Sequence, residues 1–328
     1  MIRDVLNYRG WKVFMSYDMH MFLLALLYLL YIDNVRSVWS ALLMILSFEL
    51  YGLYGFLVND YFDYESDVSS GKFRSVHRLG KGFVVVWIFL VLILEAIVLF
   101  YLGNTSFVLI YTISILLAFF YSAPPLRFKE RGALGIFVNC LIEKTLVTLA
   151  IFTYFNHMGW DTLAFVFASF FLHLADIVTH QLYDYDADSM TSTKTFAVEK
   201  GLGFVTRIYR RFVCPMALFS TITLVLSIGS VTVISTALLV AIVYAIAYLM
   251  IREGRVERRE SLVPLYVSAS FFLVHNVLPV LFAFLLAFRY FEYSVLVPLV
   301  ILSQYYTIKY KILMPVIHKV VPHVDIFN

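Results

Sequence analysis

Apolar stretches long enough to cross a lipid bilayer recur along the whole chain, separated by short polar segments. A transmembrane helix needs about 20 mostly apolar residues to cross roughly 30 Å of hydrocarbon. The first stretch is the weakest candidate, because Asp18 and Asp33 bracket a run that is short for a span. We predict an all-α fold, a polytopic transmembrane bundle of nine to ten helices. The ten candidate spans lie at about residues 19–32, 38–58, 83–102, 105–121, 133–154, 162–183, 212–229, 231–250, 262–288 and 293–308.

Composition agrees with this pattern. The chain is 62% hydrophobic and 14% charged, whereas soluble domains have roughly one-quarter charged residues. Its mean hydropathy is +0.85. Since no linker or low-complexity stretch divides the chain, we expect one transmembrane domain over residues 1–328, surrounded by membrane lipid.

The basic residues predict the orientation in the membrane. Of 25 Lys and Arg residues, all but Arg36, Lys144 and Arg289 fall at the termini or in the loops of one face. The positive-inside rule makes this face cytoplasmic, and an even number of spans explains it best. A net charge of +3 then reflects topology, so we expect no nucleic-acid partner. Cys140 and Cys214 both lie in apolar spans, which suggests neither a disulfide nor a zinc site.

Two similar acidic words, DYESD at 63–67 and DYDAD at 184–188, each follow a predicted span on that face. If the helix before the first word continues through it, Asn59, Asp63 and Asp67 step by four and Asp60 stands three before Asp63. All four side chains then share one helix face. Asp184 and Asp188 repeat the i, i+4 pair. Duplication of a four-helix unit would explain why the two acidic words are so similar.

Carboxylates stacked this closely repel one another unless a positive group neutralises them. Clusters of oxygen ligands suit Mg²⁺, whose coordination shell substrate phosphates commonly complete. The simpler interpretation is that acidic residues at a helix end face water, but two matched clusters on one face argue against it. Ionisable groups within the membrane are costly and mark functional sites. Glu143, Lys144, His173, Asp176 and His180 are such groups on the predicted spans, whereas Glu49 and Glu95 either form structural pairs or lie near an interface.

A third element, YSAPPLRFKERG at 121–132, lies on the same face. The two prolines stop the helix that Tyr121 ends, and Arg127, Lys129 and Arg131 follow at alternating positions. These residues either form an ordinary positive-inside loop or bind phosphate, and their position beside both acidic words favours phosphate.

Together these residues resemble the intramembrane prenyltransferases of the UbiA superfamily, typified by 4-hydroxybenzoate polyprenyltransferase. The family motif NDxxDxxxD is matched in full by Asn59, Asp60, Asp63 and Asp67. The second motif, DxxxDxxxGxxT, is matched by Asp184, Asp188 and Thr195, with Ser192 in place of the glycine. A tyrosine-then-basic element after the fourth helix corresponds to YSAPPLRFK. The family norm is nine helices, whereas the placement of the basic residues in this chain favours ten. The chain also has GKFRSVHRLGKG where an Arg-Pro pair is usual, with Lys72, Arg74 and Arg78 as candidate substitutes.

The resemblance implies that two aspartate clusters hold Mg²⁺ ions that bridge the diphosphate of a prenyl donor. Aromatic rings would then surround an allylic carbocation, and Tyr51, Tyr54, Phe119 and Tyr183 are candidates to line its cavity. The implied catalytic metal ligands are Asp60, Asp63, Asp67, Asp184 and Asp188, with Asn59 beside them. The implied diphosphate-binding residues are Lys72, Arg74, Tyr121, Arg127, Lys129 and Lys194. Candidates on the acceptor side, or just behind the site, are His173, Asp176 and His180.

We therefore expect Mg²⁺-dependent transfer of a prenyl group from a prenyl diphosphate to a lipophilic acceptor, aromatic or a quinone precursor. A membrane terpene cyclase, in which the cation is trapped within its own chain, would use the same residues. A transporter would spread polar residues through the bilayer depth, whereas here the acidic words gather at one face. A CDP-alcohol phosphotransferase would carry a DGxxAR-type stretch, which the sequence does not contain.

Overall fold

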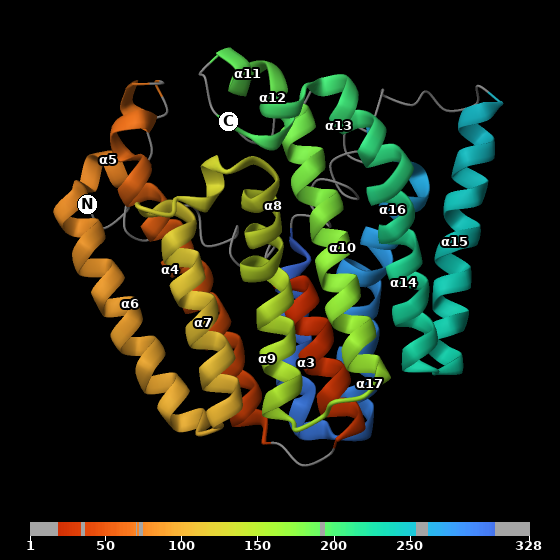
Figure 1. The fold of residues 1–328 in the computed structure, drawn as a ribbon. Coiled ribbons are helices and arrows are strands. Elements are labelled where there is room, and N and C mark those ends of the chain that lie inside the picture. Colours follow the sequence, from red (N-terminus) through yellow and green to blue (C-terminus); the bar gives the residue numbers. More distant parts are fainter. Residues whose placement is uncertain are drawn as a thin grey trace, which may run out of the picture.

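Long α-helices that run between two ends of the molecule make up nearly all of the described chain (Figure 1). This computed structural model describes residues 19–33, 37–69, 71, 75–190, 194–253 and 262–305, and these ranges contain no strand. The all-α prediction is therefore confirmed.

The predicted spans are helical in the described residues. Two shorter apolar helices, His20–Ile32 and Phe291–Ser303, correspond to the first and last of them. The seventh begins ten residues earlier than predicted, so Arg207, Arg210 and Arg211 lie on a helix and not in a loop. Within the part of the chain that the structure describes, eight helices are long and apolar enough to cross a membrane, which makes the chain an integral membrane protein: Val38–Glu65, Lys81–Leu102, Thr105–Ser122, Gly132–Tyr154, Trp160–Tyr183, Leu202–Ile228, Val231–Arg252 and Leu265–Arg289.

Three of these spans contain a π-helical segment between two α-helices. They are α8–η3–α9 (Gly132–Cys140, Leu141–Thr145, Leu146–Tyr154), α13–η4–α14 (Leu202–Ile208, Tyr209–Val213, Cys214–Ile228) and α16–η5–α17 (Leu265–Phe271, Phe272–Val277, Leu278–Arg289). The other long elements are α3 (His20–Ile32), α4 (Val38–Ser69), α6 (Lys81–Leu102), α7 (Thr105–Ser122), α10 (Trp160–Tyr183), α15 (Val231–Arg252) and η6–α18 (Phe291–Val295, Leu296–Ser303). The short elements are α5 (Ser75–Leu79), η2 (Phe128–Glu130), α11 (Tyr185–Met190) and α12 (Phe196–Lys200).

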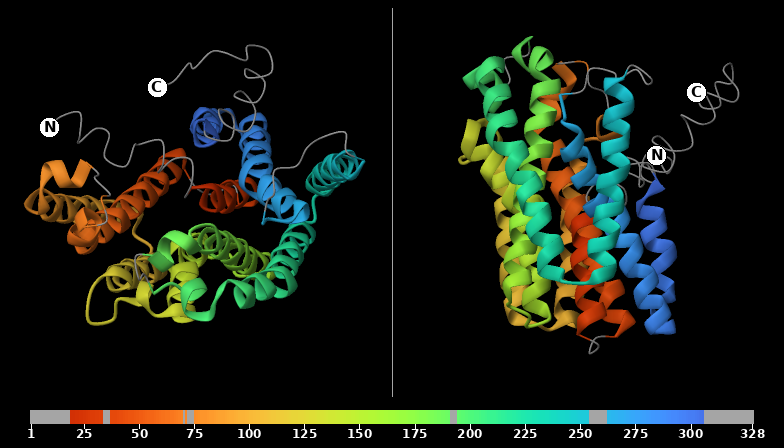
Figure 2. Two further views of the ribbon diagram at one scale, coloured as in Figure 1. Left: turned by 90° about the horizontal axis from the view of Figure 1, so that it is seen from above. Right: turned by 90° about the vertical axis from the view of Figure 1, so that its right-hand side faces the viewer.

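Helix α3, drawn in red in Figure 2, is the most deeply buried element. Residues 20–30 are all buried, and the helix packs against α9, α17 and η5. A helix enclosed by protein on every side needs no polar face, which explains the uninterrupted apolar sequence of this short span.

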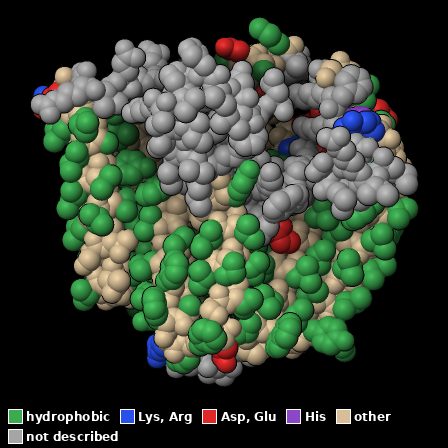
Figure 3. All heavy atoms as spheres, turned by 180° about the vertical axis from the view of Figure 1, so that it is seen from behind, with side chains coloured by type: hydrophobic (Ala, Val, Ile, Leu, Met, Phe, Trp, Pro, Cys, Tyr) green, Lys and Arg blue, Asp and Glu red, His purple; other side chains and the backbone are tan. Residues whose placement is uncertain are grey.

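Helix α15 lies at the edge of the bundle and packs mainly against α14 and α16 (Figure 1). Almost none of its residues are buried, and its large exposed hydrophobic side chains are Leu, Ile, Val, Tyr and Met. Hydrophobic side chains also cover the helices on the face shown in Figure 3. An apolar exterior of this extent is the surface that a bilayer solvates.

The elements that carry the sequence motifs lie at one end of the bundle, at the top in Figure 1. Helix α4 ends there with the first acidic word, and α10 ends there directly before the second. The short elements α5, η2, α11 and α12 lie at the same end. We call it the motif end.

Candidate active site

Helix α4 is one continuous helix of 32 residues that extends through the first acidic word to Ser69. The helix before the first acidic word thus does continue through it, and Asn59, Asp63 and Asp67 occupy successive turns of one helix. Asp60 and Asp67 are buried, at 1% and 8% exposure, whereas the Asp63 side chain is 21% exposed. Carboxylates are rarely buried without compensating partners, so this helix end is a specialised polar site.

The basic segment between α7 and α8 lies directly on this helix end. Lys129 Nζ donates to Asp63 Oδ1 at 2.5 Å and to Asn59 Oδ1 at 3.2 Å. The Ser122 hydroxyl donates to the same Asn59 oxygen at 3.1 Å. Burial lowers the pKa of Lys129, although the adjacent Asp63 carboxylate opposes that shift. The predicted proximity of the basic segment to the first acidic word is thus found.

Arg127 is the second basic residue at this site. Its Nη2 donates to Asp63 Oδ1 at 3.3 Å, its Nε to Glu130 Oε1 at 2.5 Å and its Nη1 to the Ser122 carbonyl at 3.3 Å. Its backbone has a φ of 37°, in the left-handed region that side chains other than glycine rarely adopt. The three hydrogen bonds hold it in that conformation, so the guanidinium is fixed beside the carboxylate.

Close packing of η2 on α8 holds Lys129 in place. A Cβ atom on Gly135 of α8 would collide with the Phe128 carbonyl oxygen and lie 3.4 Å from the Lys129 Cα. Only a residue without a side chain allows the segment to approach this closely.

Gly135→Ala is therefore expected to lower the free energy of unfolding by about 1–3 kcal/mol, as overpacking does elsewhere. Thermal unfolding of the purified protein in detergent measures it. Gly82→Ala is the matched control, because a Cβ at Gly82 of α6 meets no atom within 4 Å. Equal unfolding temperatures for the two variants would contradict the packing argument.

The second acidic word is built differently from the first. Helix α10 ends at Tyr183, Asp184 is its C-cap, and α11 begins at Tyr185. The one-turn spacing survives, because the Asp188 N–H donates to the Asp184 carbonyl at 2.8 Å. Asp184 is exposed and Asp188 half-buried. The two words share the motif end but not the same local structure.

Within the described residues, no group of three or more His, Cys, Asp or Glu side chains is gathered as a metal site. In this arrangement Lys129 and Arg127 neutralise Asp63 instead. The donor set of both words consists entirely of oxygen atoms, which is the ligand type that Mg²⁺ prefers. The residues present therefore fit such an ion chemically.

A cavity of about 330 Å³ extends from this polar site into the bundle between α4, α7, α8–η3 and α10. Asn59 and Ser122 belong to its wall, and so do Asn139 and Glu143. Phe48, Tyr51, Phe56 and Tyr121 contribute aromatic side chains to it. Of the predicted liners only Tyr51 is found there. Tyr54 is buried and Phe119 half-buried elsewhere, and Tyr183 is 56% exposed.

Three polar side chains form a network in and behind this wall. Asn139 Nδ2 donates to Glu143 Oε1 at 2.8 Å, and Asn139 Oδ1 lies 2.7 Å from His173 Nε2. His173 Nε2 is also 3.4 Å from Glu143 Oε2. His180 contacts Asp176 instead, at 3.7 Å, and both are largely exposed. Of the three predicted acceptor-side candidates on α10, His173 therefore belongs to the cavity network, whereas Asp176 and His180 contact each other.

The remaining predicted residues are placed as follows. Tyr121 lines the cavity beside Asn139. Lys194 is exposed, and the Thr195 hydroxyl accepts from the Val198 N–H at 3.4 Å, which caps α12. Lys72, Arg74 and Ser192 lie outside the described residues.

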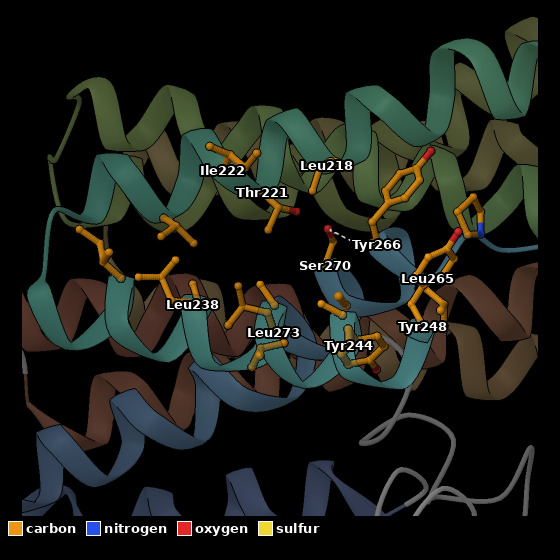
Figure 4. A pocket seen from close by; sticks show the side chains of 18 of the residues that line it. Leu218, Thr221, Ile222, Leu238, Tyr244, Tyr248, Leu265, Tyr266, Ser270 and Leu273 are labelled. Atoms are coloured by element: carbon orange, nitrogen blue, oxygen red, sulfur yellow. Dashed lines mark hydrogen bonds between the residues drawn. The ribbon is translucent and has the colours of Figure 1, made fainter. Parts of the chain in front are cut away.

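A larger pocket, of about 770 Å³, lies between α14, α15 and α16 (Figure 4). Leu218, Thr221 and Ile222 of α14 face Leu238 of α15 across it, and Ser270 donates to the Tyr266 carbonyl at 3.0 Å. No charged residue is among its described lining residues. The larger pocket is thus mainly apolar, whereas the smaller cavity has Asn59, Asn139 and Glu143 in its wall.

Fold and site together define a helical intramembrane protein with a charged, oxygen-rich cluster above an aromatic-lined cavity. The sequence profile of the UbiA prenyltransferase family matches residues 20–273. The chain therefore belongs to the UbiA prenyltransferase family, as its motifs indicate. A comparison with curated protein sequences finds no match.

Solved structures share the fold. A UbiA homologue from Archaeoglobus fulgidus, bound to Cd²⁺, has a TM-score of 0.61 at 18% identity over 89% of this chain and 99% of its own. Its complex with DMAPP and Mg²⁺ has a TM-score of 0.60 at 18% identity, over 88% and 99%. A digeranylgeranylglyceryl phosphate synthase has a TM-score of 0.57 at 15% identity, over 85% and 97%.

Proposed function

We propose that this protein transfers a prenyl group from a prenyl diphosphate to a lipophilic acceptor, aromatic or a quinone precursor, with Mg²⁺ as cofactor and an allylic carbocation as intermediate. We also propose that the motif end faces the cytoplasm. The observation that carries the proposal is the convergence of the α4 carboxylates with Lys129 and Arg127 at an aromatic-lined cavity. The Archaeoglobus fulgidus homologue is bound to GPP or DMAPP together with Mg²⁺, which supports it.

The two acidic words would hold the cation. Asp60, Asp63 and Asp67 supply carboxylates from α4, with the Asn59 carboxamide beside them, and Asp184 and Asp188 supply carboxylates from α10 and α11. Bound Mg²⁺ would neutralise the diphosphate and stabilise the charge that develops as it leaves.

The basic segment would bind the diphosphate itself. Lys129 and Arg127 both contact Asp63. Both cations are therefore close enough to bind a phosphate oxygen that lies next to that carboxylate. Charge-assisted hydrogen bonds of this kind are about twice as strong as neutral ones. Tyr121, whose side chain lines the cavity, and Lys194 complete the proposed diphosphate-binding set, with Lys72 and Arg74.

The cavity would protect the cation from water. Aromatic faces attract a cation through the ring quadrupole without forming a bond to it. The Tyr51 hydroxyl donates to the Ile142 carbonyl at 2.7 Å, so its proton is already engaged in the protein. Phe48 and Phe56 carry no heteroatom. These three aromatic side chains would therefore stabilise positive charge without a free group that captures it.

Inside-out membrane vesicles from cells that express the protein are expected to release diphosphate from geranyl diphosphate in the presence of Mg²⁺. EDTA should abolish the release, because the carboxylates would lose the ion that neutralises the leaving group. Right-side-out vesicles should be inactive, since the charged donor does not cross the bilayer to a cytoplasmic site. Diphosphate is measured with a coupled colorimetric assay.

Vesicles from cells without the protein provide the background. Release that is insensitive to EDTA would contradict the metal dependence, and equal rates in right-side-out vesicles would contradict the orientation. Products are separated by gas chromatography, with and without an added hydroxylated aromatic ring. A cyclic terpene formed without acceptor would replace the transferase proposal by a cyclase.

A further inference from the structure

Glu143 is the one acidic side chain among the described lining residues of the cavity. Its side chain is 42% exposed, whereas that of His173 directly behind it is 6% exposed. An acidic group inside a membrane-spanning helix is costly and is retained where it has a function. The metal and diphosphate sites at the mouth do not include this residue.

Hydrogen bonds fix the orientation of the Glu143 carboxyl group. A carboxylate only accepts, so the Asn139 amide directs its Nδ2 toward Glu143 Oε1 and its Oδ1 toward His173. Since the amide oxygen also only accepts, His173 must carry a proton on Nε2. The same Nε2 lies 3.4 Å from Glu143 Oε2. One residue on α8 and one on α10 therefore support the carboxyl group from its protein side.

The π-helical segment η3 (Leu141–Thr145) contains Glu143 and is itself held by side chains. Tyr51 of α4 donates to the Ile142 carbonyl at 2.7 Å, and the Thr145 hydroxyl donates to the Cys140 carbonyl at 2.8 Å. Single π turns inside α-helices are frequent at functional sites, because they alter the direction of the side chains they contain. Here the turn lies where the helix meets the cavity.

We propose that Glu143 is a catalytic base that takes the proton which the acceptor loses when it is prenylated, and that His173, through Asn139, is a positioning residue for it. The inference rests on the proposed function and adds to it the second half of the reaction. A base must lie within hydrogen-bond reach of the proton it removes, and Glu143 is placed on the wall of the same cavity that would hold the donor's prenyl group.

The bond between C1 of the prenyl group and the diphosphate oxygen breaks, and its electron pair leaves with the diphosphate. The nucleophilic atom of the acceptor forms a new bond to C1. The proton that this atom, or the hydroxyl conjugated with it, then loses moves to a Glu143 carboxylate oxygen, and water takes it up between turnovers.

Glu143→Gln keeps the size of the side chain and removes its basicity. With geranyl diphosphate and 1,4-dihydroxynaphthalene, we expect prenyl transfer to slow by at least about 100-fold, a typical contribution of a general base. Diphosphate release should slow far less, because it precedes the proton transfer. Water would then capture the cation, so the ratio of geraniol to prenylated ring should rise. Both products are measured by liquid chromatography in one reaction.

His173 is tested by rescue. His173→Leu cannot donate to Asn139 and should reduce transfer by about 10-fold, within the range by which loss of a positioning group lowers turnover. His173→Gln places an amide donor at the same position and should recover most of the rate. Glu292→Gln is the matched control for Glu143→Gln, since Glu292 is an exposed residue of η6.

The outcomes separate the two levels of the proposal. No diphosphate release by the wild-type protein would refute the proposed function itself. Release of diphosphate without any prenylation of the naphthalenediol would overturn the inference alone. A carboxylate placed as a base should accept the proton that this hydroxylated ring loses, and so allow its prenylation. It would also be overturned if Glu143→Gln transferred as fast as wild type, or if transfer and release fell by the same factor.

Discussion

Replacing Asp63 or Asp184 by alanine is expected to lower diphosphate release from geranyl diphosphate by at least about 100-fold, the effect of removing one strong electrostatic contact to a leaving group. Each variant takes one carboxylate from the proposed cation site. Asp63 lies at the centre of the polar cluster, bonded to both Lys129 and Arg127. Asp184 is the C-cap of α10 and the first residue of the second word.

Matched controls remove a nearby carboxylate of each word. Glu65→Gln changes the same turn of α4, but Glu65 is 86% exposed and pairs with Lys81, an arrangement that contributes little to stability. Asp186→Asn changes an exposed residue between Asp184 and Asp188. Both controls should keep nearly full activity. If correctly folded Asp63→Ala and Asp184→Ala proteins released diphosphate at the wild-type rate, the two words would not form the cation site.

Lys129→Gln should have the second large effect, a loss of about 100-fold or more in kcat/KM for the prenyl diphosphate. The Lys129 side chain is only 15% exposed, and its ammonium group donates to both Asn59 and Asp63. The fold should survive, because Arg127 stays within 3.3 Å of Asp63 and continues to neutralise it. Lys129→Arg should recover only part of the activity, since a planar guanidinium does not reproduce a compact ammonium group.

Lys200→Gln is the control, because this exposed lysine pairs with the neighbouring Glu199. The double variant Asp63→Ala with Lys129→Gln gives a further readout. If both residues act on one diphosphate, its loss should be smaller than the product of the two single losses. Fully multiplicative losses would indicate that Lys129 acts elsewhere.

Much of this arrangement follows from the sequence. Apolar runs predict the helices because a bilayer requires about 20 apolar residues per crossing. The i, i+4 spacing of Asn59, Asp63 and Asp67 predicts one helix face, and α4 indeed continues to Ser69. The basic segment is predicted to lie beside the acidic word because both follow spans of the same direction. Local periodicity and topology are enough for these features.

The cavity network was not predictable in the same way. Asn139 and Glu143 are four residues apart, a spacing visible in the sequence, but their contact with His173 depends on how α8 packs against α10. Likewise, nothing in the second word indicates that the helix breaks at Asp184. Tyr183 next to it is exposed as a result, and does not line the cavity. Such features depend on tertiary packing, which residue patterns do not encode.

The three π-helical segments have a consequence for comparing this chain with its relatives. A π turn contains one more residue than an α turn, so each behaves as a single-residue insertion within a membrane span. A relative whose corresponding helix is regular would need a gap inside Leu141–Thr145, Tyr209–Val213 or Phe272–Val277. Aligned without that gap, every residue beyond the turn would be matched to a partner about 100° away around the helix axis. Positions on the two sides of each turn should therefore be aligned independently.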